Sequence, residues 1–231
     1  ITERGNTLEN RHCPAGKNNT CVHCKHCSIT SGYAGAGAFS DGKFNLGTAY
    51  GGTLGEELGD DTNASNKFLG VNRIYEGTFP NIEMNTVPHL KLVQFIEAAI
   101  KESEPDVIIT HHPADTNNDH LQTSMACQEA IRLFQRRPEV KRVKEFWYME
   151  VPSCTEWKIN NAMESFNPNC YVEVGKEGVD AKIKALSMYR GVMRPYPHPR
   201  SADYITGLAA MRGGQWRQMY SEAFEVVLRA Y

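Results

Sequence analysis

The chain of 231 residues contains no apolar run that approaches the ~20 residues needed to cross a bilayer, and no charged-then-apolar signal peptide opens it. Its formal net charge of -2 provides no basic surface of the kind that nucleic acids or anionic membranes require. Neither a G-x-G-x-x-G turn after a strand nor a Walker lysine occurs, which excludes the common phosphate-binding loops. These absences predict a soluble protein with no nucleic-acid partner and no membrane span.

Cysteine is scarce beyond residue 27. Cys127, Cys154 and Cys170 stand alone, as small hydrophobic residues do in a reducing compartment, so we expect a cytoplasmic protein. The other four cysteines crowd together in a C-x7-C-x2-C-x2-C pattern: Cys13, Cys21, Cys24 and Cys27.

The spacing of that cluster favours a structural metal ion, commonly zinc, held by thiolates in a short loop. An iron–sulfur cluster is less favoured, because its spacing patterns differ. Two disulfides, or thiols without a role, would fit the same spacing, although the isolated cysteines elsewhere argue against oxidation. The cluster could hold a lid over a pocket or dock a partner.

Two regions differ in pattern. Residues 1–67 are rich in Gly, Asn, Thr and Ser and have little apolar periodicity, so we expect mostly loops there. From Phe68 onward, apolar patterns alternate between strand and helix periods. We expect strands at 71–75, 106–110, 145–151 and 171–174, and helices at 87–103, 118–134, 178–190, 204–211 and 220–229. This order predicts an α/β domain over 68–231, with a mainly parallel sheet covered on both faces.

Four large aromatic residues, Trp147, Tyr148, Trp157 and Trp216, could form a platform on which a sugar stacks. Aromatic residues in strands and helices more often belong to the core. We expect Trp147 in the core and leave Trp157 open.

The polar run HHPADTNNDH, residues 111–120, directly follows a short apolar strand that is expected to be buried. Three histidines and two aspartates are costly to place at the edge of a core unless they are used. Imidazole nitrogens and carboxylate oxygens are the usual ligands of catalytic zinc, which activates water and polarises carbonyl groups. Alternatively, Asn118 or Asp119 merely caps the following helix. Capping alone does not explain the remaining residues: His111, His112, Asp115 and His120.

The stretch PDVIITHHPADTNNDHLQT resembles the second motif of the PIG-L/LmbE-like N-deacetylases, in which the final histidine of an Asp-His pair binds zinc. The segment PHPRS and the helix after it resemble the tail of that family. KFLGVNRIYEGTFPNIEMNT and the opening ITERGN match further stretches. The resemblance covers about residues 66–231 and a few residues at the start.

The resemblance implies that His120 binds the catalytic Zn²⁺ and that Asp119 orients a catalytic histidine or water. It further implies that Asp115 and Asn117 line the metal pocket. Many members have histidine where this chain has Asn117, so His111 or His112 would have to stabilise the oxyanion. Substrate contacts are expected from the PHPRS segment, where arginine suits a phosphate or carboxylate group: His198, Arg200 and Ser201.

The family's first motif, His-Pro-Asp-Asp-Glu, which supplies two zinc ligands and the general base, does not occur in this sequence. Position 1 is Ile rather than Met. We therefore expect a fragment that lacks the first strand–helix unit of a Rossmann-like three-layer sandwich and is incomplete for catalysis.

The resemblance implies a zinc-dependent N-deacetylase, a hydrolase of linear amide bonds, whose small-molecule substrate is an N-acetylglucosamine-type sugar or conjugate. A non-catalytic, metal-stabilised binding module on the same scaffold is a different hypothesis for the same sequence. A further hypothesis is an amidase or esterase that acts on a substrate other than a sugar.

Overall fold

The structure is a computed structural model that describes residues 64–157, 159, 163–189 and 191–230. The chain divides into two compact units, residues 1–81 with 184–193 and residues 82–183 with 194–231. The predicted boundary at residue 67 stays a prediction. None of the described helices is long and apolar enough to pass through a membrane.

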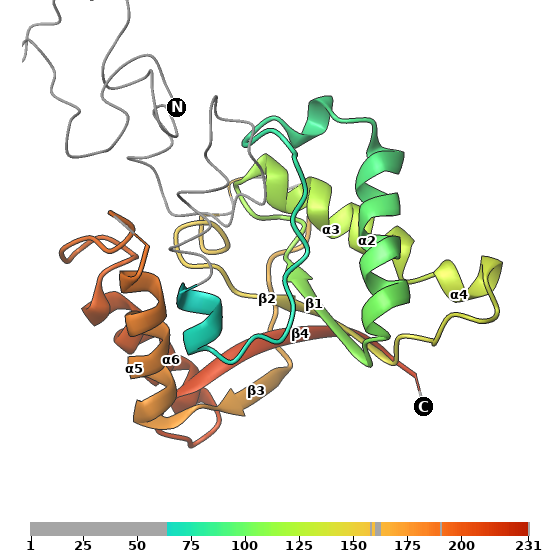
Figure 1. Ribbon diagram of the computed structural model, residues 1–231. Coiled ribbons are helices and arrows are strands. Elements are labelled where there is room, and N and C mark those ends of the chain that lie inside the picture. The colour runs from blue at the N-terminus through green and yellow to red at the C-terminus, as the bar shows by residue number, and fades with distance from the viewer. Residues whose placement is uncertain (1–63, 158, 160–162, 190, 231) are drawn as a thin grey trace, which may run out of the picture. The chain divides into compact units, whose positions relative to one another are not determined.

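The second unit contains one mixed sheet and the helices that pack on it (Figure 1). In chain order its elements are η4 (Met84–Thr86), α2 (His89–Ser103), β1 (Val107–His111), α3 (Asn118–Ala130), α4 (Leu133–Arg136), β2 (Glu145–Met149), β3 (Cys170–Glu173), α5 (Gly175–Ser187), α6 (Ala202–Gln215) and β4 (Ser221–Arg229). The last residues of α5 belong to the first unit.

The four described strands are ordered β1-β2-β4-β3. β1 runs parallel to β2, whereas β4 is antiparallel to both of its neighbours. The α/β, Rossmann-like class that the sequence predicted is confirmed. The expectation of a mainly parallel sheet requires correction for the described strands, because β4 enters between β2 and β3 in the opposite direction.

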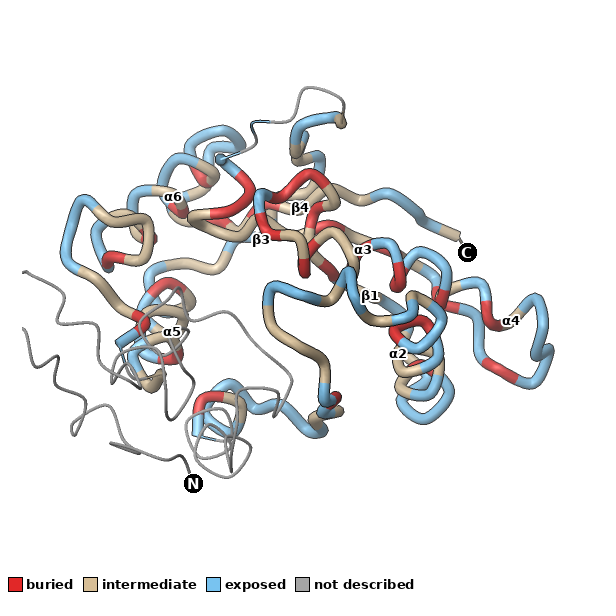
Figure 2. The backbone as a smooth tube through the Cα atoms, turned by 90° about the horizontal axis from the view of Figure 1, so that it is seen from above, coloured by how far each residue is buried: buried red, intermediate tan, exposed pale blue. Residues whose placement is uncertain are grey.

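The core of this unit lies between the sheet and helices α2 and α3. Phe146 and Tyr148 lie two residues apart on β2 and therefore point to the same face of the sheet. There they pack with Cys127 of α3 and Ile96 of α2. Figure 2 shows buried residues along the strands and on the inward sides of both helices. α2 forms where predicted, since its buried residues recur at helical spacing: Leu92, Val93 and Ile100.

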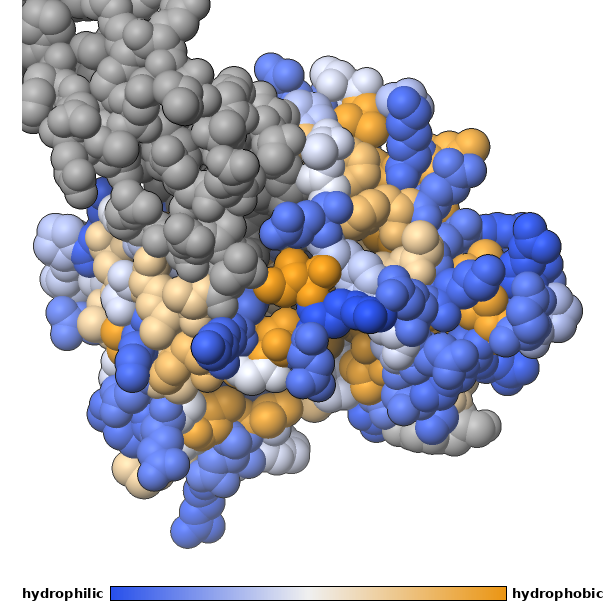
Figure 3. Space-filling view, viewed as in Figure 1, coloured by the Kyte–Doolittle hydropathy of each residue, from blue (hydrophilic) through white to orange (hydrophobic). Residues whose placement is uncertain are grey.

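β1 was predicted as a buried strand, and the structure corrects this in part. Thr110 is buried, but Val107 and Ile109 are 39% and 47% exposed. In the described sheet β1 is an edge strand that pairs with β2 alone. Apolar side chains thus reach the surface, and Figure 3 shows such patches among hydrophilic residues on the face in view.

Two predicted elements are wrong. Residues 220–229 were expected to form a helix but form β4, the strand between β2 and β3. Residues 71–75 were expected to form a strand, but they are irregular, and Val71 is 45% exposed. An apolar run without a pairing partner has little reason to adopt strand geometry.

The described part of the first unit is small. Residues 64–68 are helical, and the buried Ser65 hydroxyl donates to the carbonyl of Ala185 at 3.3 Å. The ammonium group of Lys184 lies 4.6 Å from the centre of the Phe68 ring. These contacts hold the 64–70 segment against the last residues of α5.

Candidate active site

The residues of the 111–120 run are positioned by the end of β1 and the start of α3. His111 is the last residue of β1, and a turn closed by a hydrogen bond from Asp115 N to His112 O follows it. Asn117 then caps α3, because its Oδ1 accepts from Asp119 N at 3.0 Å. The sequence suggested Asn118 or Asp119 as the cap, so the capping residue lies one position earlier.

His120 and Asp115 form a buried pair at this helix start. Asp115 Oδ2 lies 2.8 Å from His120 Nδ1, and the two side chains are 0% and 7% exposed, respectively. Because a carboxylate oxygen accepts, Nδ1 carries the proton and donates it to the hydrogen bond. In the neutral ring, His120 Nε2 then has the lone pair that a metal ion or another hydrogen-bond donor requires.

His111 stacks on His120, with ring centroids 4.0 Å apart and ring planes 22° from parallel. Burial, together with the neighbouring His120, lowers the pKa of His111 to about 3. His111 is thus a neutral imidazole near neutral pH. A neutral ring beside His120 can hydrogen-bond to a polar ligand without adding charge to the site.

Three buried polar atoms of this group have no hydrogen-bond partner among the described residues: His111 Nδ1, Asp115 Oδ1 and Asn117 Nδ2. An unsatisfied buried polar atom costs about 1–3 kcal/mol, so several of them in one short segment are not explained by stability. They are the groups through which this site could hold a ligand.

His112 points away from this group into the core. It is 3% exposed and contacts the rings of Tyr148 and Phe166 edge-on, at 5.3 and 5.7 Å. Its Nδ1 accepts from Ala114 N at 3.1 Å, and its Nε2 lies 3.6 Å from Glu225. Of the two histidines considered for the oxyanion, the geometry therefore places His111, and not His112, beside His120. The catalytic assignment of His112 stays a prediction.

Asp119 occupies a different position from the one expected of a residue that orients His120. One carboxylate oxygen accepts from Ile82 N, and the other accepts from Met84 N at 3.1 Å. Asp119 thus holds the segment that leads into η4, whereas Asp115 contacts the imidazole. A catalytic role for Asp119 stays a prediction.

The PHPRS segment forms a second local group at the start of α6. The Ser201 hydroxyl accepts from Tyr204 N at 3.1 Å and so caps α6, and Ser201 is only 2% exposed. His198 Nδ1 accepts from Arg200 N at 3.1 Å. These contacts account for Ser201 as a structural cap. The substrate-binding roles of His198, Arg200 and Ser201 stay predictions.

The fit of a zinc ion can be judged from this donor set. His120 suits one position of a zinc site. The hydrogen bond from its Nδ1 to Asp115 fixes the ring, and Nε2 is the atom that could bind the metal. In the described part of the chain, no three His, Cys, Asp or Glu side chains gather as a metal site. The fit is therefore partial. The predicted cluster at Cys13, Cys21, Cys24 and Cys27 lies outside the described residues.

Glu225 is a partner of His112 that sequence reasoning missed. It faces His112 and accepts from Asn167 N at 2.9 Å. It lies on β4, opposite Tyr148 of β2. Assigning residues 220–229 to a helix hid this contact, and strand periodicity would have placed Glu225 on the same face as Ala223.

Solved structures with the same fold come from several organisms. The chain matches the conserved protein TT1542 from Thermus thermophilus at TM-score 0.60 and 20% identity, over 76% of this chain and 75% of that one. N,N'-diacetylchitobiose deacetylase from Pyrococcus horikoshii matches at TM-score 0.60 and 15% identity, over 83% and 70%. GalB, a 4-carboxy-2-hydroxymuconate hydratase from Pseudomonas putida KT2440, matches at TM-score 0.58 and 18% identity, over 78% and 74%. At these identities the likeness establishes the fold alone.

Sequence comparison gives the family. No curated protein matches the chain. The family model described as PIG-L, GlcNAc-PI de-N-acetylase, matches residues 15–131, which is just over half of the sequence. This range includes His111, Asp115 and His120, which the structure brings together at the start of α3. The chain therefore belongs to the PIG-L family.

Proposed function

We propose that this protein acts as a zinc-dependent hydrolase that removes the N-acetyl group from an N-acetylglucosamine-type sugar or sugar conjugate. The observation that carries the proposal is the buried Asp115–His120 pair, which occupies His120 Nδ1 and leaves the other ring nitrogen, Nε2, outside this contact. The stacked, neutral His111 supports it, because it adds a polar group beside His120.

In this proposal each residue has one task. His120 would hold zinc, and Asp115 fixes the plane of the His120 ring. When bound, zinc supplies a Lewis acid that polarises an amide carbonyl and acidifies water. His111 offers a neutral imidazole to the polar atoms of the substrate, and Asn117 keeps the loop in place through its cap of α3.

One family description and one solved structure support the choice of substrate. The family model is described by a GlcNAc-PI de-N-acetylase, and a solved structure with the same fold is a deacetylase of N,N'-diacetylchitobiose. Both descriptions specify deacetylation, and both involve N-acetylglucosamine. We extend this substrate class to the present chain.

A non-catalytic binding module is the second candidate. It is favoured by one observation, the absence of a three-residue metal cluster from the described part of the chain. The fold by itself does not decide between the two, since one similar structure is a hydratase. A module of this kind would bind metal or sugar through the same His120 but would release no acetate.

The test is acetate release by the 231-residue chain from the dimer and trimer of N-acetylglucosamine, with and without added Zn²⁺. Because the sequence does not contain His-Pro-Asp-Asp-Glu, we expect slow, zinc-dependent release, and we expect His120→Ala to abolish it. A matched control is His89→Ala, because His89 also pairs with a carboxylate, Glu129 at 3.2 Å, but on a more exposed surface. The control should keep full activity.

Two outcomes would reject the hydrolase. Zinc binding through His120 without acetate release would favour the binding module. Acetate release that survives His120→Ala would show that the reaction uses another site.

A further inference from the structure

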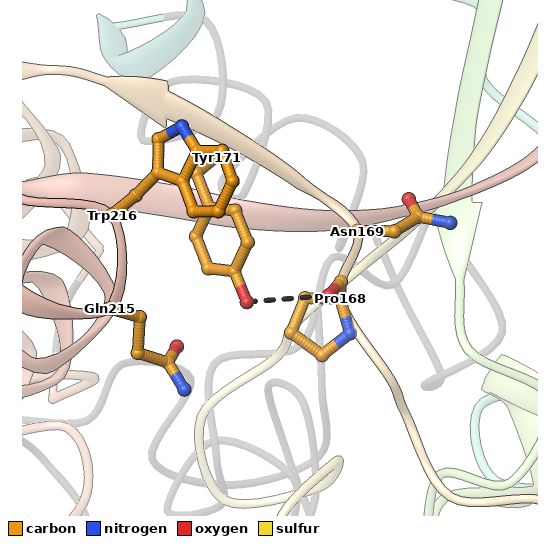
Figure 4. Close-up of a pocket in the computed structure, with 5 residues that line it drawn as sticks. All are labelled: Pro168, Asn169, Tyr171, Gln215 and Trp216. Atoms are coloured by element: carbon orange, nitrogen blue, oxygen red, sulfur yellow. Dashed lines mark hydrogen bonds between the residues drawn. The ribbon is translucent and has the colours of Figure 1, made fainter.

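A pocket lined by two stacked aromatic rings lies between the end of α6 and the start of β3 (Figure 4). Its volume is about 550 Å³. Tyr171 belongs to β3 and Trp216 is the C-cap of α6. The remaining lining residues are Pro168, Asn169 and Gln215. The volume falls within the range of about 300–1,000 Å³ that small-molecule sites occupy.

Of the two aromatic residues, Trp216 is exposed and Tyr171 is half-buried. The rings of Tyr171 and Trp216 are nearly parallel, 9° apart, with centroids separated by 5.9 Å. Trp216 is 66% exposed, so much of its indole surface remains in water. An aromatic group that contributes to the core is normally buried. Core packing therefore does not explain the position of Trp216, and the flat surface is open to a ligand.

The pocket wall is held rigid by hydrogen bonds. Tyr171 donates its hydroxyl proton to Pro168 O at 3.3 Å, as Figure 4 shows. The Asn169 side chain accepts from Val226 N at 2.8 Å and donates to Val226 O at 3.3 Å. Because these contacts fix the segment before β3 to β4, the aromatic surface is formed before any ligand arrives.

The chemistry of the wall specifies an uncharged, ring-shaped ligand. None of the five lining side chains carries a charge. The oxygen of Gln215 accepts from Arg212 at 3.0 Å, so the amide nitrogen is what this side chain can offer as a donor. A pyranose ring combines a flat C–H face, which suits an aromatic ring, with hydroxyl oxygens that suit an amide donor.

We propose that Tyr171, Trp216 and Gln215 form a binding subsite for a neutral pyranose sugar. This subsite is separate from the His111–His120 group. Trp216 contributes the stacking surface, and the stacked ring of Tyr171 packs against the Trp216 ring. Gln215 donates a hydrogen bond to a sugar hydroxyl.

The register of the sheet separates this subsite from the candidate active site. His111 pairs with Met149, Met149 with Phe224, and Phe224 with Cys170, whereas Tyr171 pairs with Ala223. Because successive residues of a strand point to opposite faces, Tyr171 lies on the opposite face of the sheet from the His111 row. The subsite therefore does not rest on the proposed function.

The test measures binding without turnover. The full 231-residue chain is titrated with the trimer of N-acetylglucosamine, by calorimetry and by tryptophan fluorescence. We expect Trp216→Ala to weaken binding by about tenfold, Trp216→Phe to restore part of it, and Gln215→Ala to weaken it less. The control is Trp157→Ala, which removes another exposed tryptophan, 59% exposed, and should bind normally.

The outcomes separate this inference from the proposed function. If the chain binds the trimer through Trp216 but releases no acetate, the subsite stands and the hydrolase does not. If His120→Ala removes acetate release but leaves trimer affinity unchanged, both stand. Equal trimer affinity in Trp216→Ala and the unaltered chain would overturn the subsite, as would binding of a proline-rich peptide in place of any sugar.

Discussion

The imidazole of His120 lies 2.8 Å from the carboxylate of Asp115, which precedes it by five residues. Its immediate neighbour Asp119 points elsewhere, to the backbone of Ile82 and Met84. Adjacent residues in a helix lie about 100° apart around the axis and do not face each other. The turn before α3 therefore supplies the partner that the first turn of α3 does not.

Removing the charge of Asp115 should weaken zinc binding by His120. In Asp115→Asn the ring loses its carboxylate partner, and changes of this kind lower metal affinity by about 10- to 100-fold. Titration of the purified chain with Zn²⁺ measures the effect. Glu129→Gln is the matched control, since it alters the partner of His89, and equal affinities in the two variants would contradict the assigned role of Asp115.

Removing the cap of α3 should destabilise the fold modestly. Asn117→Ala loses the hydrogen bond to Asp119 N and should lower the free energy of unfolding by about 1 kcal/mol. Urea denaturation followed by circular dichroism measures this. Asn117→Asp keeps a capping oxygen and should restore most of the stability, so a loss as large as that of Asn117→Ala would argue against capping.

Breaking the ion pair between α6 and the end of β2 should cost more. Arg212 donates to both oxygens of Glu150, at 2.6 and 2.8 Å, and the two side chains are only 13% and 10% exposed. Arg212→Ala leaves a mostly buried carboxylate without its partner, for which we expect a loss of about 3 kcal/mol.

The matched comparison is Arg229→Ala. Arg229 pairs with Glu145 at 3.3 Å and is 52% exposed, so its removal should cost less than about 1 kcal/mol. The same urea experiment ranks the two variants. Equal losses would mean that burial does not govern the strength of these pairs.

Two glycines of α6 should respond to alanine in opposite directions. A Cβ atom at Gly213 would lie 2.7 Å from Gln218 O and 2.8 Å from Met219 O, so Gly213→Ala must displace backbone and should destabilise the protein. A Cβ atom at Gly207 meets nothing within 4 Å, so Gly207→Ala should add up to about 1 kcal/mol through helix propensity. Thermal unfolding of the two variants checks the sign, and a gain in Gly213→Ala would refute the close contact.

Local patterns predicted much of the fold. α2 was recognisable because its apolar residues recur at helical spacing, and β2 because Phe146, Trp147 and Tyr148 favour a strand. β4 was missed because Ala223, Val226 and Val227 also fit a helical period. Its strand geometry is imposed by pairing with β2 and β3, which are distant in sequence.

The candidate site was predicted by composition rather than by geometry. The structure places the histidines and aspartates of residues 111–120 between the end of β1 and the first turn of α3. Which carboxylate contacts His120, and which histidine stacks on it, depends on where α3 begins. That boundary is set by the cap at Asn117. Trp216 was noted as a possible sugar platform, but its partner Tyr171 comes from a strand 45 residues earlier and lies outside any local pattern.

The central position of β4 also governs when this protein can fold during its synthesis. In the described sheet β3 pairs only with β4, and β2 pairs with β4 along one of its two edges. β4 is the last of the described strands to be translated. Until the ribosome has delivered it, the backbone N–H and C=O groups on the facing edges of β2 and β3 lack their sheet partners, and contacts between residues so far apart in sequence form slowly. The described sheet thus cannot assemble as one unit before β4 has emerged.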